Sequence, residues 1–439
     1  MRYVVRGAHV VDPANEVDGV RDVAVENGRI AAVEPVIEPG TAPVLDAGGL
    51  HLFPGLVDVH VHLREPGFEY KETVATGTRA AAAGGFTAVA CMPNTKPVND
   101  NAEVTRYILD QARAAGVCRV YPVGAISKGL KGEDLAEMGE LAEAGCVAVT
   151  DDGMPVTSSL LMRRAMEYAK GFGLVVVSHC EDLELADGGC VNEGLTSAFL
   201  GLPAYCSEAE EVMVARDLLL ARRTGARLHL AHLSTRGSVE LLRWGKRLLR
   251  LPVTGETAPH YFTFTDDAVR GFDTHFKMNP PLREIADLEG IQRALSRGVI
   301  DAIATDHAPH AADEKEREFE AAANGVIGLE TSLALSLRLA RHGIVPLRRV
   351  VAALTCGPAR ALNLPGGTLS VGAAADLVLV DLDATFTVDP AAFQSKARNC
   401  PFAGMELSGR VVRTVVAGNT VFQDGRIAAD NLETAETVL

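Results

Sequence analysis

The sequence lacks long hydrophobic runs, paired cysteines and an excess of basic residues. No stretch approaches the roughly 20 apolar residues that a membrane-spanning helix needs. Residues 1–11 do not show the basic and then apolar layout of a signal peptide. The eight cysteines include no Cys-x-x-Cys pair, which argues against a disulfide framework or a cysteine zinc site. We therefore expect a cytoplasmic protein with free thiols and no membrane partner.

The charge balance is acidic, with 42 Lys and Arg against 57 Asp and Glu, and a formal net charge of −15. A protein whose main partner is nucleic acid needs a basic surface to meet the phosphates. The content of 47% hydrophobic and 23% charged residues is ordinary for a globular protein. The composition therefore favours a globular protein that does not act on nucleic acid.

Both ends of the chain contain short β-rich segments separated by turns. Near the N-terminus these are Tyr3–Val11, Asp22–Val25 and Arg29–Val33, and near the C-terminus they are Asp376–Val380, Val411–Val416 and Thr420–Phe422. Neither end is long enough to bury a good core alone. We therefore predict one small β-sandwich domain built from residues 1–52 and 365–439, with residues 53–364 inserted between them.

The middle of the chain alternates apolar β-rich runs with helical segments. The eight runs are Leu56–His62, Phe86–Met92, Arg119–Gly124, Cys146–Asp151, Leu174–His179, Arg227–His232, Leu251–Gly255 and Val299–Asp306. The helical segments between them include Thr73–Ala83, Glu133–Ala144, Ser158–Phe172 and Glu208–Arg223. Repeated β-α units imply parallel strands, and eight of them in about 300 residues favour a (β/α)₈ barrel of the α/β class. An open doubly wound sheet is the alternative, but no G-x-G-x-x-G or P-loop motif supports it.

Residues of the types that bind metals lie at the ends of five of these runs. His60 and His62 close the first run, and their spacing of two places both imidazoles on one face of a strand. The other candidates at run ends are Asp151, Asp152, His179, His232 and Asp306. In a barrel these ends converge on the face where active sites form. A set of His and carboxylate ligands without thiolates suits Zn²⁺ or a similar divalent ion in a catalytic site.

With these residues the chain resembles the amidohydrolase superfamily, and within it most closely class I dihydroorotase. The resemblance runs nearly end to end and is carried by the motifs His60-Val61-His62-Leu63-Arg64-Glu65-Pro66-Gly67, Met92-Pro93-Asn94-Thr95, Lys277-Met278-Asn279-Pro280-Pro281-Leu282-Arg283 and Thr305-Asp306-His307-Ala308-Pro309-His310. Their order and spacing together are strongly specific.

The resemblance implies a reversible, zinc-dependent cyclisation of N-carbamoyl-L-aspartate to L-dihydroorotate, with one or two Zn²⁺ per chain. His60 and His62 would hold one metal, and His179 and His232 a second. Many amidohydrolases bridge the metals with a carboxylated lysine, but no lysine lies between Met138 and Tyr168. Relatives of this class use an Asp there, and the family spacing favours Asp152 over Asp151, which stays open. Asp306 would act as general base and acid, the alternative being a purely ligating role.

A substrate carboxylate outside the reacting amide calls for a cation at the barrel mouth. Arg64 lies two residues beyond His62, on the same side, and its guanidinium offers bidentate geometry. By family likeness the further substrate-binding residues are His62, Asn94, Asn279, His310, Asn324 and Gly325. Many relatives have Phe-Gly where this chain has Asn324-Gly325. His260 and His307 are expected only to support the site, and His229 to have no role.

Two other functions compete with an active dihydroorotase. A hydantoinase or allantoinase is disfavoured by Arg64 and Asn94, because neutral rings lack the carboxylate that these residues would bind. Dihydroorotase-like chains that have lost metal ligands serve as scaffolds for aspartate transcarbamoylase, but this chain retains every expected ligand. The resemblance also implies a homodimer, or a complex with aspartate transcarbamoylase.

Overall fold

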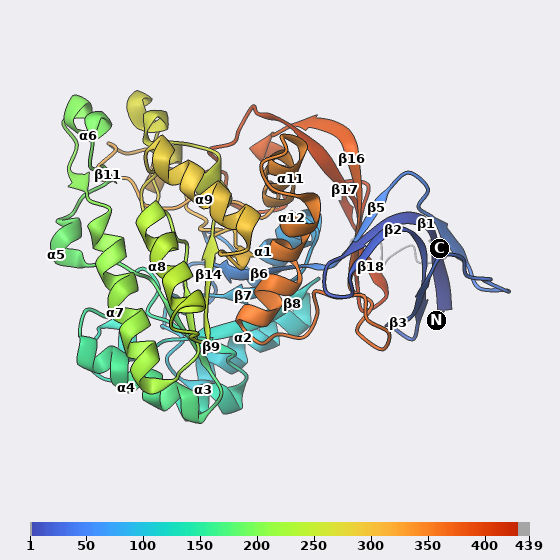
Figure 1. The fold of residues 1–439 in the computed structure, drawn as a ribbon, viewed down its shortest axis with the longest axis horizontal. Coiled ribbons are helices and arrows are strands. Elements are labelled where there is room, and N and C mark those ends of the chain that lie inside the picture. The colour runs from blue at the N-terminus through green and yellow to red at the C-terminus, as the bar shows by residue number, and fades with distance from the viewer. Residues whose placement is uncertain (1, 429–439) are drawn as a thin grey trace.

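The computed structural model describes residues 2–428 and contains two large sheets (Figure 1). One sheet is parallel and is surrounded by helices, and the other is built from strands of both chain ends. In the described part of the chain, no helix combines the length and the apolar character needed to cross a membrane.

The parallel sheet is a barrel of eight strands that follow one another in chain order. They are β6 (Leu56–Val61), β7 (Phe86–Cys91), β8 (Arg119–Gly124), β9 (Ala148–Val149), β10 (Val175–Ser178), β13 (Leu228–Leu230), β14 (Val253–Thr257) and β15 (Ala302–Ile303). A parallel bridge between Val61 and His307 joins the first strand to the segment after the last. Each predicted run supplies one strand, so the barrel is confirmed and the open sheet is excluded.

The strands form because their runs are rich in β-branched and other apolar residues that are buried on both faces, as parallel strands require. Side chains such as Val57, Val59 and Val177 fill the interior of the barrel, which is therefore a packed core. The strands also carry a few buried polar side chains, such as Asp58, His229 and Glu256.

The helices that follow the barrel strands cover the outside of the barrel (Figure 1). They are α1 (Val74–Ala83), α2 (Ala102–Ala115), α3 (Met138–Ala144), α4 (Ser159–Gly171), α7 (Glu208–Thr224), α8 (Arg236–Arg247), α9 (Ile285–Arg297), α11 (Ser332–Arg341), α12 (Leu347–Leu354) and α13 (Cys356–Ala361). Thr73 caps α1 through a capping box with Thr76. The helix expected from Glu133 begins only at Met138, because Leu135 instead pairs with Ser127 in a β-bridge.

Several short elements lie beyond the carboxyl ends of the strands. Between β10 and α7 the chain forms α5 (Leu183–Ala186), β11 (Val191–Asn192), α6 (Leu195–Leu200) and β12 (Ala204–Tyr205). Three 3₁₀ turns, η2 (Pro259–Phe262), η3 (Asp266–Gly271) and η4 (Thr274–Phe276), follow β14, α10 (Ala312–Lys315) follows β15, and η1 (Lys128–Leu130) follows β8. These short elements and their loops surround the mouth of the barrel.

The second sheet has nine strands, and its two halves meet at β5. Its strands are β1 (Arg2–Asp12), β2 (Val17–Glu26), β3 (Arg29–Glu34), β4 (Val44–Asp46), β5 (His51–Pro54), β16 (Leu377–Thr387), β17 (Glu406–Val416), β18 (Asn419–Gln423) and β19 (Arg426–Ile427). Strand β5 pairs with β1 on one side and with β16 on the other. Both chain ends therefore form one sheet, while the exact division at residues 52/53 and 364/365 stays a prediction.

Candidate active site

The predicted ligand residues all lie at the carboxyl ends of barrel strands. His60 is in β6 and His62 follows it directly, whereas the other four follow β9, β10, β13 and β15. These four are Asp152, His179, His232 and Asp306. All six side chains are buried, with exposed fractions between 0% for His60 and 8% for Asp306. The barrel therefore brings together residues that are up to 246 positions apart in the sequence.

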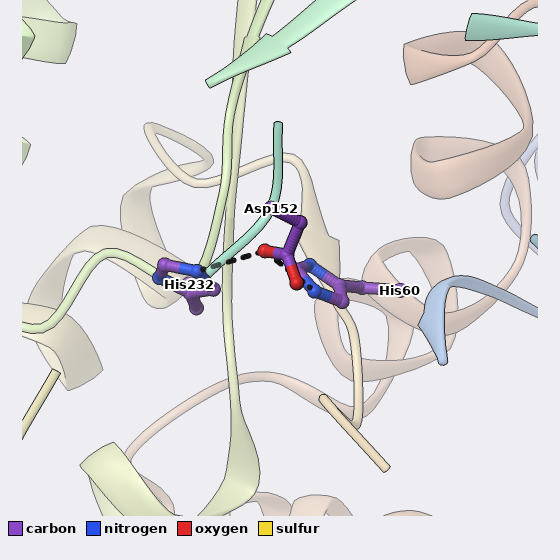
Figure 2. Close-up of side chains that lie close together, drawn as sticks. All are labelled: His60, Asp152 and His232. Carbon is purple, nitrogen blue, oxygen red and sulfur yellow. Dashed lines mark ion pairs between the residues drawn. The ribbon is translucent and has the colours of Figure 1, made fainter. Parts of the chain in front are cut away.

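The carboxylate of Asp152 lies between His60 and His232 (Figure 2) and also contacts His62 and His179. Its Oδ1 is 3.3 Å from His60 Nε2 and 3.6 Å from both His179 Nδ1 and His232 Nε2. Its Oδ2 is 3.5 Å from His62 Nε2. Burial by itself would raise the pKa of Asp152, but the surrounding imidazoles hold it well below its usual range. Asp152 is therefore an ionised carboxylate in contact with four histidines.

Asp151 faces the opposite way, although it is the neighbouring residue. Its carboxylate accepts hydrogen bonds from the backbone N–H groups of Ile126 (2.8 Å) and Ser127 (2.9 Å) and from the Ser127 hydroxyl. Burial raises the pKa of Asp151 to about 6, against the effect of these hydrogen bonds. Asp151 thus holds the loop after β8, and of these two neighbours it is Asp152 that lies among the imidazoles.

The geometry of the group fits a divalent metal centre. Two ligands about 2.1 Å from one tetrahedral Zn²⁺ lie roughly 3.4 Å apart, close to the 3.2–3.7 Å between the nitrogen and oxygen atoms here. His60 Nε2 is buried without a hydrogen-bond partner and points at Asp152. Two overlapping sets could each hold an ion, namely His60, Asp152 and His232, and His60, His62 and Asp306. The donors are nitrogen and oxygen atoms only, as in catalytic zinc sites.

Asp306 lies beside the first histidine pair. Its Oδ1 is 3.2 Å from His62 Nε2 and 3.7 Å from His60 Nε2. Burial would raise its pKa, but the hydrogen bond with His62 and the nearby imidazoles lower it overall. Asp306 and His232 both have positive φ, 49° and 31°, a conformation that is uncommon for residues with a Cβ and that collects at functional sites. The surroundings of Asp306 therefore favour the ionised form of its carboxylate.

Two buried glutamates that the sequence motifs did not indicate contact ring nitrogens of the predicted ligand histidines. Glu256 Oε1 is 2.7 Å from His60 Nδ1, and its Oε2 is 3.0 Å from His229 Nε2. Glu181 Oε2 is 2.9 Å from His179 Nε2. A carboxylate on the second ring nitrogen sets the tautomer of a metal-binding histidine. A charged residue in an apolar strand would have pointed to Glu256, but the predicted run ended at Gly255 and β14 extends to Thr257. His229, for which no role was expected, contacts Glu256.

Two of the predicted substrate-binding asparagines contact this same group. Asn94, after β7, accepts a hydrogen bond at Oδ1 from His62 Nδ1 at 2.8 Å. Asn279, after η4, donates through Nδ2 to Glu181 Oε2 at 3.0 Å. Both side chains therefore reach the histidine cluster from the wall of the barrel mouth.

The remaining predicted substrate residues line another side of the mouth. Arg64, with φ of 63°, donates through Nε to the carbonyl of Pro309 at 3.1 Å. His310 Nε2 is 2.8 Å from the carbonyl oxygen of Asn324. Gly325 is buried, whereas Asn324 is exposed and meets His310 through its backbone. Arg64, His310 and the 324–325 loop are thus connected through one short segment after β15.

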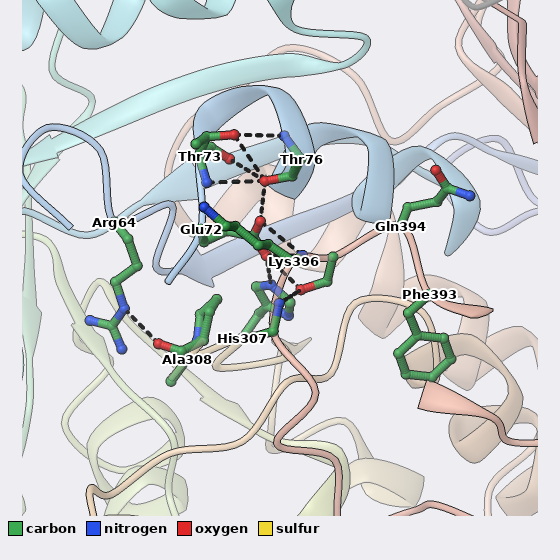
Figure 3. A network of polar contacts seen from close by, with 12 residues as sticks. Arg64, Glu72, Thr73, Thr76, His307, Ala308, Phe393, Gln394 and Lys396 are labelled. Atoms are coloured by element: carbon green, nitrogen blue, oxygen red, sulfur yellow. Dashed lines mark hydrogen bonds and ion pairs between the residues drawn. The ribbon is translucent and has the colours of Figure 1, made fainter. Parts of the chain in front are cut away.

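His307 supports this segment through a network shown in Figure 3. Its Nε2 is 3.4 Å from Glu72 Oε2, and its backbone carbonyl accepts a hydrogen bond from the His62 N–H at 2.8 Å. His260 is buried beside Tyr261, and burial lowers the pKa of His260 to about 4. Both histidines lie next to the ligand cluster and not among the atoms that surround Asp152.

Several curated relatives of the chain are named dihydroorotase. Residues 49–238 match a family described as dihydro-orotase-like, and residues 271–422 match a family described as amidohydrolase family. The dihydroorotase of Syntrophotalea carbinolica is 56% identical over 424 residues, covering 96% of this chain and 99% of that protein. The dihydroorotase of Anaeromyxobacter dehalogenans (strain 2CP-C) is 56% identical over 425 residues, covering 96% and 98%. That of Geobacter metallireducens is 53% identical over 424 residues, covering 96% and 100%.

Solved structures with the same fold include cyclic amidases with lower sequence identity. An L-hydantoinase (dihydropyrimidinase) from Arthrobacter aurescens matches with a TM-score of 0.88 at 27% identity, covering 97% of both chains. A dihydropyrimidinase from Brevibacillus agri matches with a TM-score of 0.85 at 23% identity, covering 98% of this chain and 96% of that one. The latter likeness concerns the fold alone.

Proposed function

This chain belongs to the dihydroorotase family of the amidohydrolases, and we propose that it interconverts N-carbamoyl-L-aspartate and L-dihydroorotate in pyrimidine synthesis. The enzyme is a hydrolase of cyclic amides: ring opening consumes one water, and ring closure releases it. The observation that carries the substrate assignment is the near end-to-end identity with dihydroorotases, together with a guanidinium at the mouth of a barrel that otherwise presents His and Asp.

The proposed cofactor is Zn²⁺, with two ions per chain. His60 and His62 would hold one, His179 and His232 the other, and Asp152 would bridge them, which its contacts with all four imidazoles support. When bound, Zn²⁺ lowers the pKa of water from about 16 towards about 7 and polarises an amide carbonyl. Glu256 and Glu181 would fix the tautomer and the orientation of His60 and His179 and raise the basicity of their ligand nitrogens.

Asp306 is the proposed proton carrier. Its lowered pKa leaves it ionised at neutral pH, so that it can accept a proton from the attacking water. Ring opening then needs a proton on the departing ring nitrogen, and Asp306 returns it there. In the direction of ring closure the same carboxylate removes the proton from the carbamoyl nitrogen.

Arg64 is the proposed partner of the substrate carboxylate, which lies outside the reacting amide. The guanidinium offers parallel N–H donors to a carboxylate, and only its Nε is engaged with Pro309 by a hydrogen bond that the structure shows. Asn94, His310 and the backbone of Asn324 and Gly325 would complete this end of the pocket, and Asn279 would reach the ring.

Substrate preference tests the proposal. The zinc-supplemented protein is assayed in parallel on L-dihydroorotate, hydantoin, allantoin and dihydrouracil, with a chelated control. Chelator-sensitive turnover of L-dihydroorotate alone is the expected result. Preference for a neutral ring would be consistent with the proposed metal centre but would contradict the role of Arg64 as the partner of a substrate carboxylate. Absence of any turnover with metal verified would instead favour a scaffold for aspartate transcarbamoylase.

Other expectations rest on the composition, in the case of the location, or on the family resemblance, in the case of the assembly. The cytoplasmic location, the homodimer and a complex of the active enzyme with aspartate transcarbamoylase stay predictions. Size-exclusion chromatography with light scattering, on the protein alone and mixed with the transcarbamoylase, measures the last two directly.

A further inference from the structure

The segment between β16 and β17 passes along the barrel mouth, although it belongs to the C-terminal part of the chain. It contains the turn η5 (Pro390–Ala392) and then residues 393–400. Asn399 in this segment is 3% exposed. No motif of the sequence analysis includes it, and the proposed reaction gives it no role.

The side chain of Asn399 joins two loops that carry proposed substrate-binding residues. Its Oδ1 accepts a hydrogen bond from the His310 backbone N–H at 3.1 Å. Its Nδ2 donates to the carbonyl of Ala308 at 2.9 Å and to that of Gly325 at 3.1 Å. The single amide thus uses its oxygen and both hydrogens on the 308–310 and 325 segments.

These two segments are packed so closely that the position of one determines that of the other. Gly325 has φ of 129°, and a Cβ there would lie 2.7 Å from Ala308 Cβ and 3.2 Å from His310 Nε2. The Ala308 N–H donates to the Val326 carbonyl at 2.8 Å. Loss of the Asn399 side chain would leave the Ala308 carbonyl and the His310 N–H of this junction without their partner, in a buried place, while the Gly325 carbonyl would keep its hydrogen bond from Lys315 Nζ at 3.1 Å.

The other end of the segment is held by a buried carboxylate. Glu72 accepts hydrogen bonds from the Ser395 hydroxyl at 2.5 Å and from the Lys396 N–H at 3.2 Å. Glu72 also contacts His307, which adjoins Asp306 in the chain (Figure 3). Because residues 395–396 are held independently, a change at Asn399 acts on the junction locally and does not release the whole segment.

We propose that Asn399 is a positioning residue that sets His310 and Gly325 for the substrate carboxylate. It does not touch the substrate itself, and it lies away from the atoms around Asp152. The inference rests on the proposed function, because it concerns the same pocket. It predicts a loss of substrate binding with little effect on the metal centre or on the chemical step.

The test is Asn399→Ala, measured with L-dihydroorotate in the zinc-loaded enzyme. We expect KM to rise about tenfold or more, with kcat changed less than about threefold and with the metal content of the wild type. Asn99→Ala is the matched control: Asn99 is also fully buried, and it donates to Val123 and accepts from Thr105. The control is expected to lose thermal stability without a change in KM. Should Asn399→Ala not fold, Asn399→Ser, which keeps one polar group, is expected to raise KM by a smaller factor.

The outcomes separate this inference from the proposed function. A wild-type enzyme that turns over L-dihydroorotate, with an unchanged KM in the Asn399 variants, overturns the positioning role alone. Equal losses of kcat and metal content also overturn it, because they indicate a merely structural role. A wild-type enzyme without turnover of L-dihydroorotate overturns the proposed function and this inference with it.

Discussion

Asp151 and Asp152 are neighbours that the barrel uses for different purposes. Asp152 is surrounded by four imidazoles, whereas Asp151 accepts three hydrogen bonds from the loop after β8. Burial raises the pKa of Asp151, and the imidazoles lower that of Asp152. The pKa values of two acids of the same type are therefore shifted in opposite directions by their surroundings.

Replacing each acid by alanine separates the two roles. Asp152→Ala is expected to lose at least one metal equivalent and turnover, because a bridging ligand is absent. Asp151→Ala is expected to keep its metal and lose about 2 kcal/mol of stability, since two backbone N–H groups and a hydroxyl lose their acceptor. Elemental analysis and thermal melting measure both effects. If only the Asp151 variant lost metal, Asp151 would be the metal ligand and Asp152 the residue with a structural role.

Asp306→Ala removes the proposed proton carrier. We expect turnover of L-dihydroorotate to fall by about 10²–10⁴-fold, the usual contribution of a positioned acid–base group. The circular dichroism spectrum should match that of the wild type, because Asp306 lies at the mouth and not in the core. Residual activity within tenfold of the wild type would leave Asp306 with a ligating role only.

Arg64→Ala removes the proposed partner of the substrate carboxylate. KM is expected to rise and kcat to fall together, with kcat/KM lower by about 10–100-fold, since a hydrogen bond between charged groups contributes about 1.5–3 kcal/mol. Arg163, an exposed residue of α4 that pairs with Glu167, provides the control. Arg163→Ala should behave as the wild type, and equal kinetics in both variants would remove Arg64 from the pocket.

At the scale of elements, the segment after η5 is held by a second buried carboxylate besides Glu72. Glu330, at the turn before α11, accepts hydrogen bonds from the N–H groups of Gln394 (3.0 Å) and Ser395 (3.1 Å). Burial raises its pKa to about 7, and these hydrogen bonds only partly oppose that rise. Ionisation of Glu330 is therefore expected to affect the connection between α11 and the C-terminal segment.

The raised pKa of Glu330 gives stability a pH dependence of known sign. Between the ordinary carboxyl pKa of 4.5 and the folded value of about 7, the folded state binds more protons than the unfolded state, so stability falls as pH rises. We expect the melting temperature to decrease between pH 5 and pH 8, and to decrease less in Glu330→Gln. Parallel pH profiles for the two proteins would show that another group is responsible.

At the scale of the whole molecule, the proposed metal centre joins five barrel strands that are otherwise separate in the sequence. Its histidines and acids are buried, and their nitrogen and oxygen atoms lie 3.2–3.7 Å apart. A metal that binds only the folded state stabilises it in proportion to the logarithm of its concentration. The centre is therefore expected to stabilise the barrel as well as to serve the reaction.

Chelation tests this coupling in the intact protein. Removal of the metal should abolish turnover and lower the melting temperature, since an ion present at 1,000 times its Kd contributes about 4 kcal/mol. Added Zn²⁺ should restore both. A melting temperature that does not change on verified metal removal would contradict a stabilising role and leave the catalytic role in place.

The order of elements could be predicted because it depends on local patterns. Each of the eight apolar runs forms a barrel strand, and the β-rich ends form one sheet. The start of α3 was wrong because a bridge from Leu135 to Ser127, a tertiary contact, takes the residues before Met138 out of the helix. The end of β14 was set too early, which hid Glu256.

The sequence by itself determined the barrel, the placement of His and Asp at strand ends and the likeness to dihydroorotases, because strand period and motif spacing act over a few residues. Only the tertiary structure decided which of Asp151 and Asp152 faces the imidazoles, that Glu256 holds His60, and that Asn399 joins the loops of His310 and Gly325. These contacts cross 196 positions for His60 and Glu256 and 89 for His310 and Asn399. They form only when barrel closure brings distant strand ends together, and no local pattern encodes that geometry.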